Sequence, residues 1–90
     1  MSSYISVFLN LFVESRGLSK VTEALVKLPE VVDAYEVTGE CDVVATLHVE
    51  NIQVFRELLK NKILKIDGVK STVSSVVLHS YKHQPTETAQ

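Results

Sequence analysis

The sequence predicts a small α+β domain with the element order β-α-β-β-α-β. The chain has 90 residues, which is the length of one domain. Four segments are rich in β-branched and aromatic residues, as strands are, and two segments between them repeat apolar residues at helical spacing. Two β-α-β halves joined by a hairpin make a ferredoxin-like fold, with a four-stranded antiparallel sheet and both helices on one face.

The first third of the chain is expected to contain one strand and one helix. The strand is expected at residues 4–13, YISVFLNLFV, where the odd positions are all aliphatic and the even positions mix aromatic and polar side chains. Because side chains alternate across a sheet, its two faces must have different partners. The helix is expected at residues 15–28, and Pro29 ends its apolar repeat.

The remaining elements carry clear boundary signals. Gly39-Glu40 is expected to form a tight turn, since glycine adopts backbone conformations that are costly for other residues. Asn51 is an expected helix N-cap, and Asp67-Gly68 ends that helix. We expect residues 1–81 to form the domain and the polar residues 82–90 to be a flexible tail. The second strand, third strand, second helix and fourth strand are expected at residues 31–38, 42–50, 52–66 and 69–81.

The sheet face away from the helices is expected to be a dimer interface. Small soluble monomers seldom leave an aromatic patch of this kind in water. A second sheet packed against it in a twofold dimer would cover the patch and enlarge a small core. The alternative is a monomer with a sparsely apolar open face. The residues expected on this face are Tyr4, Ser6, Phe8, Asn10, Val44, Thr46 and His48.

Charge and cysteine content narrow the class of protein. The net charge is −2, and the basic residues are interleaved with acids, so the basic face that nucleic-acid binding needs is missing. Cys41 is the single cysteine and cannot form an internal disulfide, which fits a reducing compartment. The apolar N-terminal segment is too short to span a bilayer and lacks the flanks of a signal peptide. We therefore expect a cytoplasmic protein that does not touch DNA or membranes directly.

The sequence contains no pattern that predicts an enzyme, a metal or a cofactor. His48, His79 and His83 lack metal-ligand spacing, and no glycine-rich phosphate loop is present. We therefore expect a protein that is not an enzyme. One enzymatic alternative stays open, a small dimeric α/β-barrel enzyme of the monooxygenase kind, whose cavity would be lined by Ser6, Asn10 and His48.

Three motifs resemble the effector domain of the Lrp/AsnC (leucine-responsive or feast/famine) regulators. The run YEVTGECDVV at residues 35–44 is similar to the V-T-G-x-aromatic-D signature of that family, with Cys41 at the aromatic position. The run KIDGVKSTVS at residues 65–74 is similar to its I-x-G-V-x-x-T-x-T segment, and LPEV at residues 28–31 also matches. The resemblance covers about residues 4–81, and the motifs stand in the order and spacing of the family.

The resemblance implies an oligomeric RAM (regulation of amino acid metabolism) domain. Such domains pair sheet to sheet as dimeric α/β barrels, and the dimers often assemble into tetramers or octamers. Small effectors, usually amino acids, bind between dimers near the glycine-containing hairpin. Most members carry an N-terminal helix-turn-helix domain. This sequence starts three residues before its first expected strand, so we expect the stand-alone form of the module.

The resemblance also implies five ligand-binding residues, carried over by position. Gly39 would offer its backbone, Asp42 would face the ammonium group of the ligand, and Thr72 and Ser74 would supply hydroxyls, with Thr38 beside them. A zwitterion needs an anion near its ammonium and donors near its carboxylate. Structural alternatives exist for each: Gly39 as a turn residue, Asp42 as a cap of its own turn, and the hydroxyl residues as ordinary strand positions.

The predicted function is therefore amino-acid sensing by an oligomeric module related to transcription regulators. A second possibility is a pure assembly module that pairs with full-length Lrp/AsnC regulators and binds no small molecule. The alternatives differ in simple ways: a sensor binds an amino acid, an assembly module co-purifies with a larger homologue, and an enzyme holds a cofactor.

Overall fold

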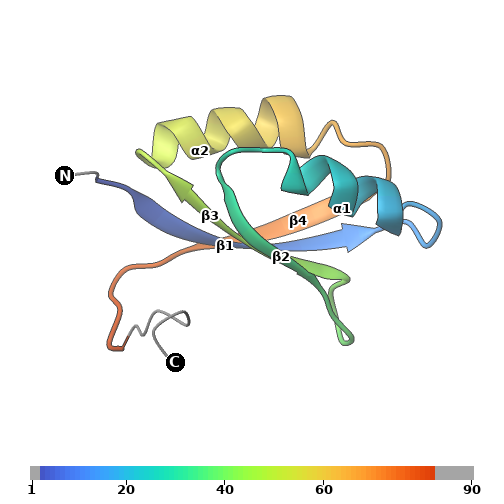
Figure 1. The fold of residues 1–90 in the computed structure, drawn as a ribbon, viewed down its shortest axis with the longest axis horizontal. Helices are drawn as coiled ribbons and strands as arrows, with labels where there is room; N and C mark the ends of the chain where they lie inside the picture. Colours follow the sequence, from blue (N-terminus) through green and yellow to red (C-terminus); the bar gives the residue numbers. More distant parts are fainter. Residues whose placement is uncertain (1–2, 83–90) are drawn as a thin grey trace.

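The computed structural model describes residues 3–82 as a four-stranded antiparallel sheet with two helices on one face (Figure 1). The strand order is β2-β3-β1-β4, so β1 and β3 are central and β2 and β4 form the edges. This arrangement confirms the predicted ferredoxin-like fold. The elements are β1 (Ile5–Val13), α1 (Leu18–Val26), β2 (Val31–Glu36), β3 (Val43–Val49), α2 (Ile52–Leu58), the π-helical turn η1 (Leu59–Ile63) and β4 (Val69–Val76).

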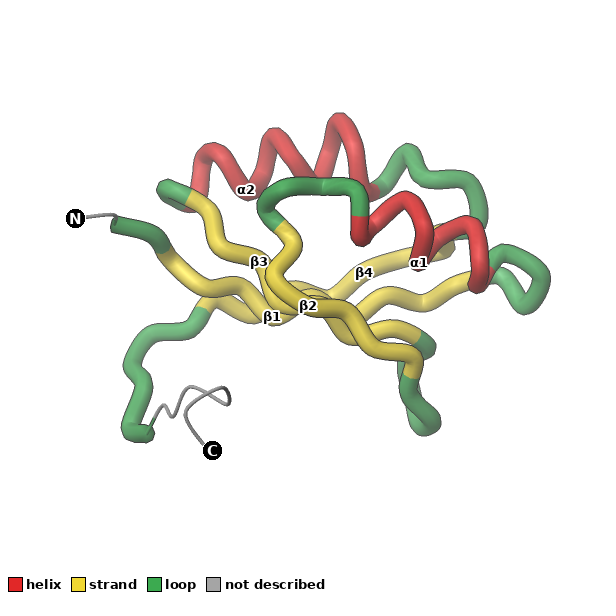
Figure 2. Tube along the Cα trace, viewed as in Figure 1, coloured by secondary structure: helices red, strands yellow, loops and turns green. Residues whose placement is uncertain are grey.

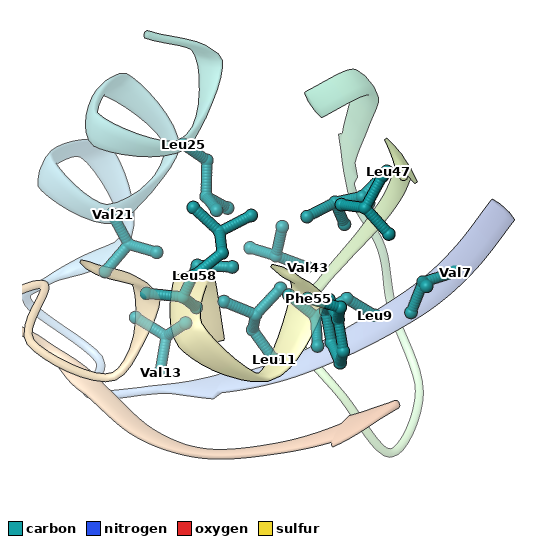
Figure 3. Packing of buried hydrophobic residues seen from close by; sticks show 13 residues of the cluster. Val7, Leu9, Leu11, Val13, Val21, Leu25, Val43, Leu47, Phe55 and Leu58 are labelled. Carbon is teal, nitrogen blue, oxygen red and sulfur yellow. The ribbon is translucent and has the colours of Figure 1, made fainter. Parts of the chain in front are cut away.

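The hydrophobic core fills the layer between the sheet and the helices (Figure 3). Alternate residues of the two central strands point into this layer, as the aliphatic odd positions predicted. The helices close it with one apolar face each. Residues with 0% exposure are Val7, Leu9, Leu11, Val21, Leu25, Val43, Ala45, Leu47 and Ile63.

Helix α1 begins at Leu18, three residues later than predicted. The preceding residues 14–17 form the β1–α1 connection, which packs against the start of β4 instead of extending the helix. The Glu14 N–H donates to the Gly68 carbonyl at 2.8 Å. A Cβ on Gly17 would lie 3.0 Å from the Gly68 Cα, a tighter contact than most Cβ atoms make. The two glycines therefore permit a close backbone crossing, which the segment 14–17 could not make if it were helical.

Helix α2 begins as predicted, and the Asn51 side chain accepts a hydrogen bond from the Val54 N–H at 2.8 Å. The helical run ends at Ile63 rather than at residue 66. Its last turn is π-helical, with the Leu64 N–H donating to the Leu59 carbonyl at 2.8 Å. The wider turn lets Leu58 and Ile63, five residues apart, both lie in the core.

Strand β4 ends at Val76, so the predicted strand over residues 69–81 was too long. The Val77 N–H still donates to the Ser6 carbonyl at 2.9 Å, but β1 begins at Ile5 and offers no partner further on. The chain then runs away from the sheet on the side opposite the helices (Figure 2). Apart from Lys82, the predicted flexible tail lies outside the described residues.

Candidate ligand-binding site

The loop between β2 and β3 spans residues 37–42 and is longer than the two-residue turn that was predicted. The Val37 N–H donates to the Asp42 carbonyl at 3.0 Å and closes the loop. Gly39 has a φ of +120°, in the region that side chains disfavour, and a Cβ there would meet no atom within 4 Å. The backbone shape thus requires Gly39, and the loop presents Thr38 and Gly39 to solvent.

Asp42 ties this loop to the central strand. Its Oδ2 accepts a hydrogen bond from the Val13 N–H at 2.8 Å, and its own N–H donates to the Leu11 carbonyl at 3.0 Å. The bond lies where the β1–β4 register shifts between Phe12 and Val13. The Asp42 side chain therefore caps a neighbouring strand, while its backbone carbonyl closes its own loop. Its second carboxylate oxygen makes no hydrogen bond within residues 3–82.

Thr72 and Ser74 lie on β4, on the side of β1 away from the loop. Thr72 pairs with Leu11 and Ser74 with Leu9, which places both on the helix-covered face of the sheet. Because β1 separates β3 from β4, Thr72 and the loop are about 10 Å apart across two strand spacings. No side-chain hydrogen bond among the described residues joins them. The five candidate residues are therefore not gathered into one site within a single copy.

The predicted dimer-face residues do share one surface. Ser6 pairs with His48, Phe8 with Thr46, and Asn10 with Val44, all on the face opposite the helices. The Tyr4 ring stacks on the His48 ring, with 3.9 Å between centroids and 15° between planes. His48 is thus held in an aromatic contact at the surface.

Three further residues of this face were missed from the sequence. Register places Tyr35 and Asp33 of β2 beside Val44 and Thr46, and Val73 of β4 beside Asn10. Tyr35 is 59% exposed and Val73 is 53% exposed. Which face an edge-strand residue occupies depends on how that strand pairs with its neighbour. In β2 the bulge between Val31 and Asp33 shifts this pairing, so the sequence alone does not show which residues lie on the open face. The one feature of the sequence that could have indicated a residue of this face in β2 was the aromatic side chain of Tyr35.

The open face is hollowed near the start of β1. The hollow has a volume of about 580 Å³. Of the three residues that the enzymatic alternative requires, Ser6 and His48 line it, whereas Asn10 lies further along β1. Asp33 Oδ1 is buried here and accepts no hydrogen bond. The lining residues are Tyr4, Ser6, Phe8, Val32, Asp33, Thr46, His48, Val77 and Ser80.

Two other hollows lie on the outer surface and mix both signs of charge, so neither selects a ligand of one charge. One is on α2 and η1, and the other is at the β1–α1 connection. They are lined by Gln53, Arg56, Glu57, Leu59, Lys60 and Leu64, and by Glu14, Arg16, Gly17, Lys20, Asp67 and Gly68, respectively.

Metal-binding and membrane-spanning features can be assessed over the described part of the chain. Residues 3–82 contain no group of three side chains that could hold a metal ion. No helix in that range has the length and apolar character needed to cross a bilayer. Cys41 is a half-buried free thiol at the end of the β2–β3 loop.

Comparison with known proteins identifies relatives over nearly the whole chain. The HTH-type transcriptional regulator FL11 of Pyrococcus furiosus is 33% identical over 78 residues, which cover 87% of this chain and 51% of the regulator. E. coli AsnC superposes with a TM-score of 0.85 at 26% identity, over 90% of this chain and 55% of AsnC. The fold is also that of the Neisseria meningitidis regulator NMB0573 in its L-methionine complex, with a TM-score of 0.83 at 23% identity, over 88% of this chain and 53% of that one.

These relatives are transcription regulators, and this chain spans about half the length of the curated ones that it matches. The sequence model of the Lrp/AsnC ligand binding domain matches residues 6–87. It therefore covers the sheet, both helices and all five residues carried over from the family motifs. The chain belongs to the Lrp/AsnC family through this ligand-binding domain.

Proposed function

We propose that this chain is an amino-acid-sensing and oligomerisation module that binds a small amino acid between dimers, beside the β2–β3 loop. The observation that carries the proposal is the match of residues 6–87 to a ligand-binding domain. The methionine complex of the Neisseria relative supports amino acids as the ligand class. We expect the module to act in the cytoplasm, where the regulators of its family act.

The open sheet face supports a homodimer as the first level of assembly. Tyr4, Phe8, Tyr35 and Val73 are about half exposed on this face, at 52%, 49%, 59% and 53%. Contiguous apolar surface of this kind is typical of interfaces. Pairing two such faces about a twofold axis gives a dimeric α/β barrel. Dimers would then assemble into tetramers or octamers.

The geometry of the candidate residues supports a ligand site completed by a second dimer. Asp42 has one carboxylate oxygen committed to Val13 and another available to an ammonium group. Thr38 and Gly39 are exposed on the same loop. Thr72 and Ser74 lie beyond β1 and cannot meet a ligand at the loop of their own copy, so in this proposal hydroxyl contacts come from a neighbouring copy.

A thermal-shift screen of the 90-residue chain against the common amino acids tests the proposal. We expect a selective rise for one or a few of them, since a ligand at 100 times its Kd stabilises the native state by about 2.7 kcal/mol. Asp42→Asn keeps an acceptor for Val13 but removes the charge, so it should abolish the rise. Glu40→Gln removes a charge from the same loop and should keep it. A flat response of the unmodified chain to every amino acid would rule out the sensor.

A second candidate function is assembly with full-length regulators of the same family. The observation that favours it is that the curated relatives share this domain but are about twice as long and are HTH-type regulators. In this proposal, as in the sensor, the chain needs no helix-turn-helix domain of its own, and its net charge of −2 leaves DNA contact to the partner. Mixed oligomers with a full-length regulator, together with a flat amino-acid screen, would favour this function over sensing.

A further inference from the structure

The last described segment, residues 77–82, is here called the C-terminal arm. It leaves the sheet on the open face, opposite the helices (Figures 1 and 2). Leu78 is 95% exposed and Tyr81 is 93% exposed, more than any other large apolar side chain among the described residues. The Tyr81 ring packs edge-on with the His79 ring of its own arm, with 4.6 Å between the ring centroids. The arm therefore carries apolar surface that lacks a partner within its own copy.

The hollow on the open face lacks groups that the arm has. Tyr4, Phe8 and Val32 give it an apolar lining, and the described residues that line it beside the buried Asp33 Oδ1 include no lysine or arginine. A buried carboxylate oxygen without a hydrogen bond is costly, so a donor or cation that reaches it from a partner would be stabilising there. A segment that combines apolar side chains with a cationic or hydrogen-bonding group would therefore complement the hollow.

The arm of the same copy does not meet this need. Val77 and Ser80 form one wall of the hollow, while Leu78 and Tyr81 remain exposed. The arm carries His79 and Lys82 and no acidic residue, so its charge complements that of the hollow. Six extended residues span roughly 20 Å, whereas packed sheets lie about 10 Å apart. An arm is therefore long enough to cross to a second copy.

We propose that in the dimer each C-terminal arm lies in the hollow of the partner copy, where Leu78 and Tyr81 become buried and His79 and Lys82 supply donors for Asp33. The inference rests on the sheet-to-sheet dimer of the proposed function and adds to it a reciprocal exchange of arms. It accounts together for the exposed arm, the hollow in the sheet face and the absence of a hydrogen bond to Asp33 Oδ1 within the described residues.

Cross-linking between differently tagged copies tests the exchange. In a Cys41→Ser background, one copy carries Val32→Cys in the hollow and the other carries Leu78→Cys in the arm. After co-refolding and mild oxidation, we expect a disulfide-linked heterodimer on a non-reducing gel. The matched control replaces the first cysteine by Val26→Cys, which is 65% exposed on α1 at the other face, and should give none.

Each outcome bears on a different claim. If the Cys41→Ser parent is a dimer by light scattering but the Val32/Leu78 pair stays unlinked, the arm exchange is wrong and the dimer stands. The hollow would then hold another occupant, such as a small amine. Linking of both pairs to the same extent, or a monomeric parent, would also overturn the exchange. The amino-acid screen reports separately on sensing.

Truncating the arm side chains gives a second measure. Leu78→Ser and Tyr81→Ser together should weaken the dimer by about a hundredfold or more, because each buried side chain of this size contributes about a factor of ten. Val26→Ser removes an apolar side chain that is 65% exposed on α1 and should leave the dimer Kd unchanged. Equal dimer Kd values for the arm variant and the control would contradict the exchange.

Discussion

At the scale of single residues, Asp42 has two tasks that compete for its carboxylate. One oxygen holds the Val13 N–H at 2.8 Å and joins the β2–β3 loop to the central strand. The other is available to a ligand. A structural bond thus fixes the orientation of the group that we propose as the ammonium partner, and this reduces the entropy lost when a ligand binds.

Two substitutions at Asp42 should distinguish the contribution of its hydrogen bond to the free energy of unfolding from that of its charge. Asp42→Ala leaves the Val13 N–H without its acceptor and should lower the free energy of unfolding by about 1–2 kcal/mol. Asp42→Asn keeps an acceptor and should lose less than half of that. Urea denaturation of both variants and the parent measures the difference. Equal losses for Ala and Asn would mean that the charge, rather than the hydrogen bond, stabilises the loop.

At the scale of elements, the connections decide where the helices begin. Gly68 precedes β4 with a φ of +106°, and a Cβ there would lie 3.1 Å from Val21 Cγ2 and 3.2 Å from the Gly17 Cα. The start of α1 and the start of β4 are therefore a single packed unit, although about fifty positions separate them in the sequence.

Gly68→Ala should destabilise the domain by about 1–3 kcal/mol, because it adds backbone strain and a steric contact. Gly39→Ala has the same kind of backbone strain but open space around it, so its cost should be smaller. Thermal unfolding of the two variants compares them. A Gly39 variant that is less stable than the Gly68 variant would contradict the importance of the Gly17–Gly68 crossing.

At the scale of the whole molecule, one layer of helices covers a sheet whose other face remains open (Figure 1). The core side of that sheet is closed, with Leu9 and Leu47 fully buried. The open side carries half-exposed rings. A domain of about this size buries only around two thirds of its unfolded surface, so pairing two open faces would add stability that one copy lacks.

Phe8→Glu should convert the dimer into a monomer, because it places a charge at the centre of the open face. Light scattering after size exclusion should then give 10.0 kDa rather than the mass of a dimer or of a higher oligomer built from dimers. Val26→Glu, at an exposed position on α1, is the matched control and should keep the mass of the parent. A dimeric Phe8→Glu variant would place the interface elsewhere.

The predictions from sequence succeeded where the deciding contacts are local or periodic. Alternation in β1 and β3 identified the core, and Asn51 identified the start of α2. They failed where contacts between residues far apart in the sequence determine where an element begins or ends. The start of α1 depends on Gly68, the end of β4 depends on where β1 begins, and the π-helical turn follows from packing Leu58 and Ile63 together. The Asp42 bond joins positions 29 apart, which no local pattern indicates.

The central position of β1 sets the order in which the domain can fold during synthesis. β1 emerges from the ribosome first, yet its two neighbours in the sheet are β3 and β4. Both edges of this apolar strand stay unpaired until β3 has been made at residue 49, and one edge stays open to other chains until β4 ends at residue 76. Folding must therefore wait for almost the entire domain, and any delay late in translation prolongs the period in which the nascent chain is prone to aggregate.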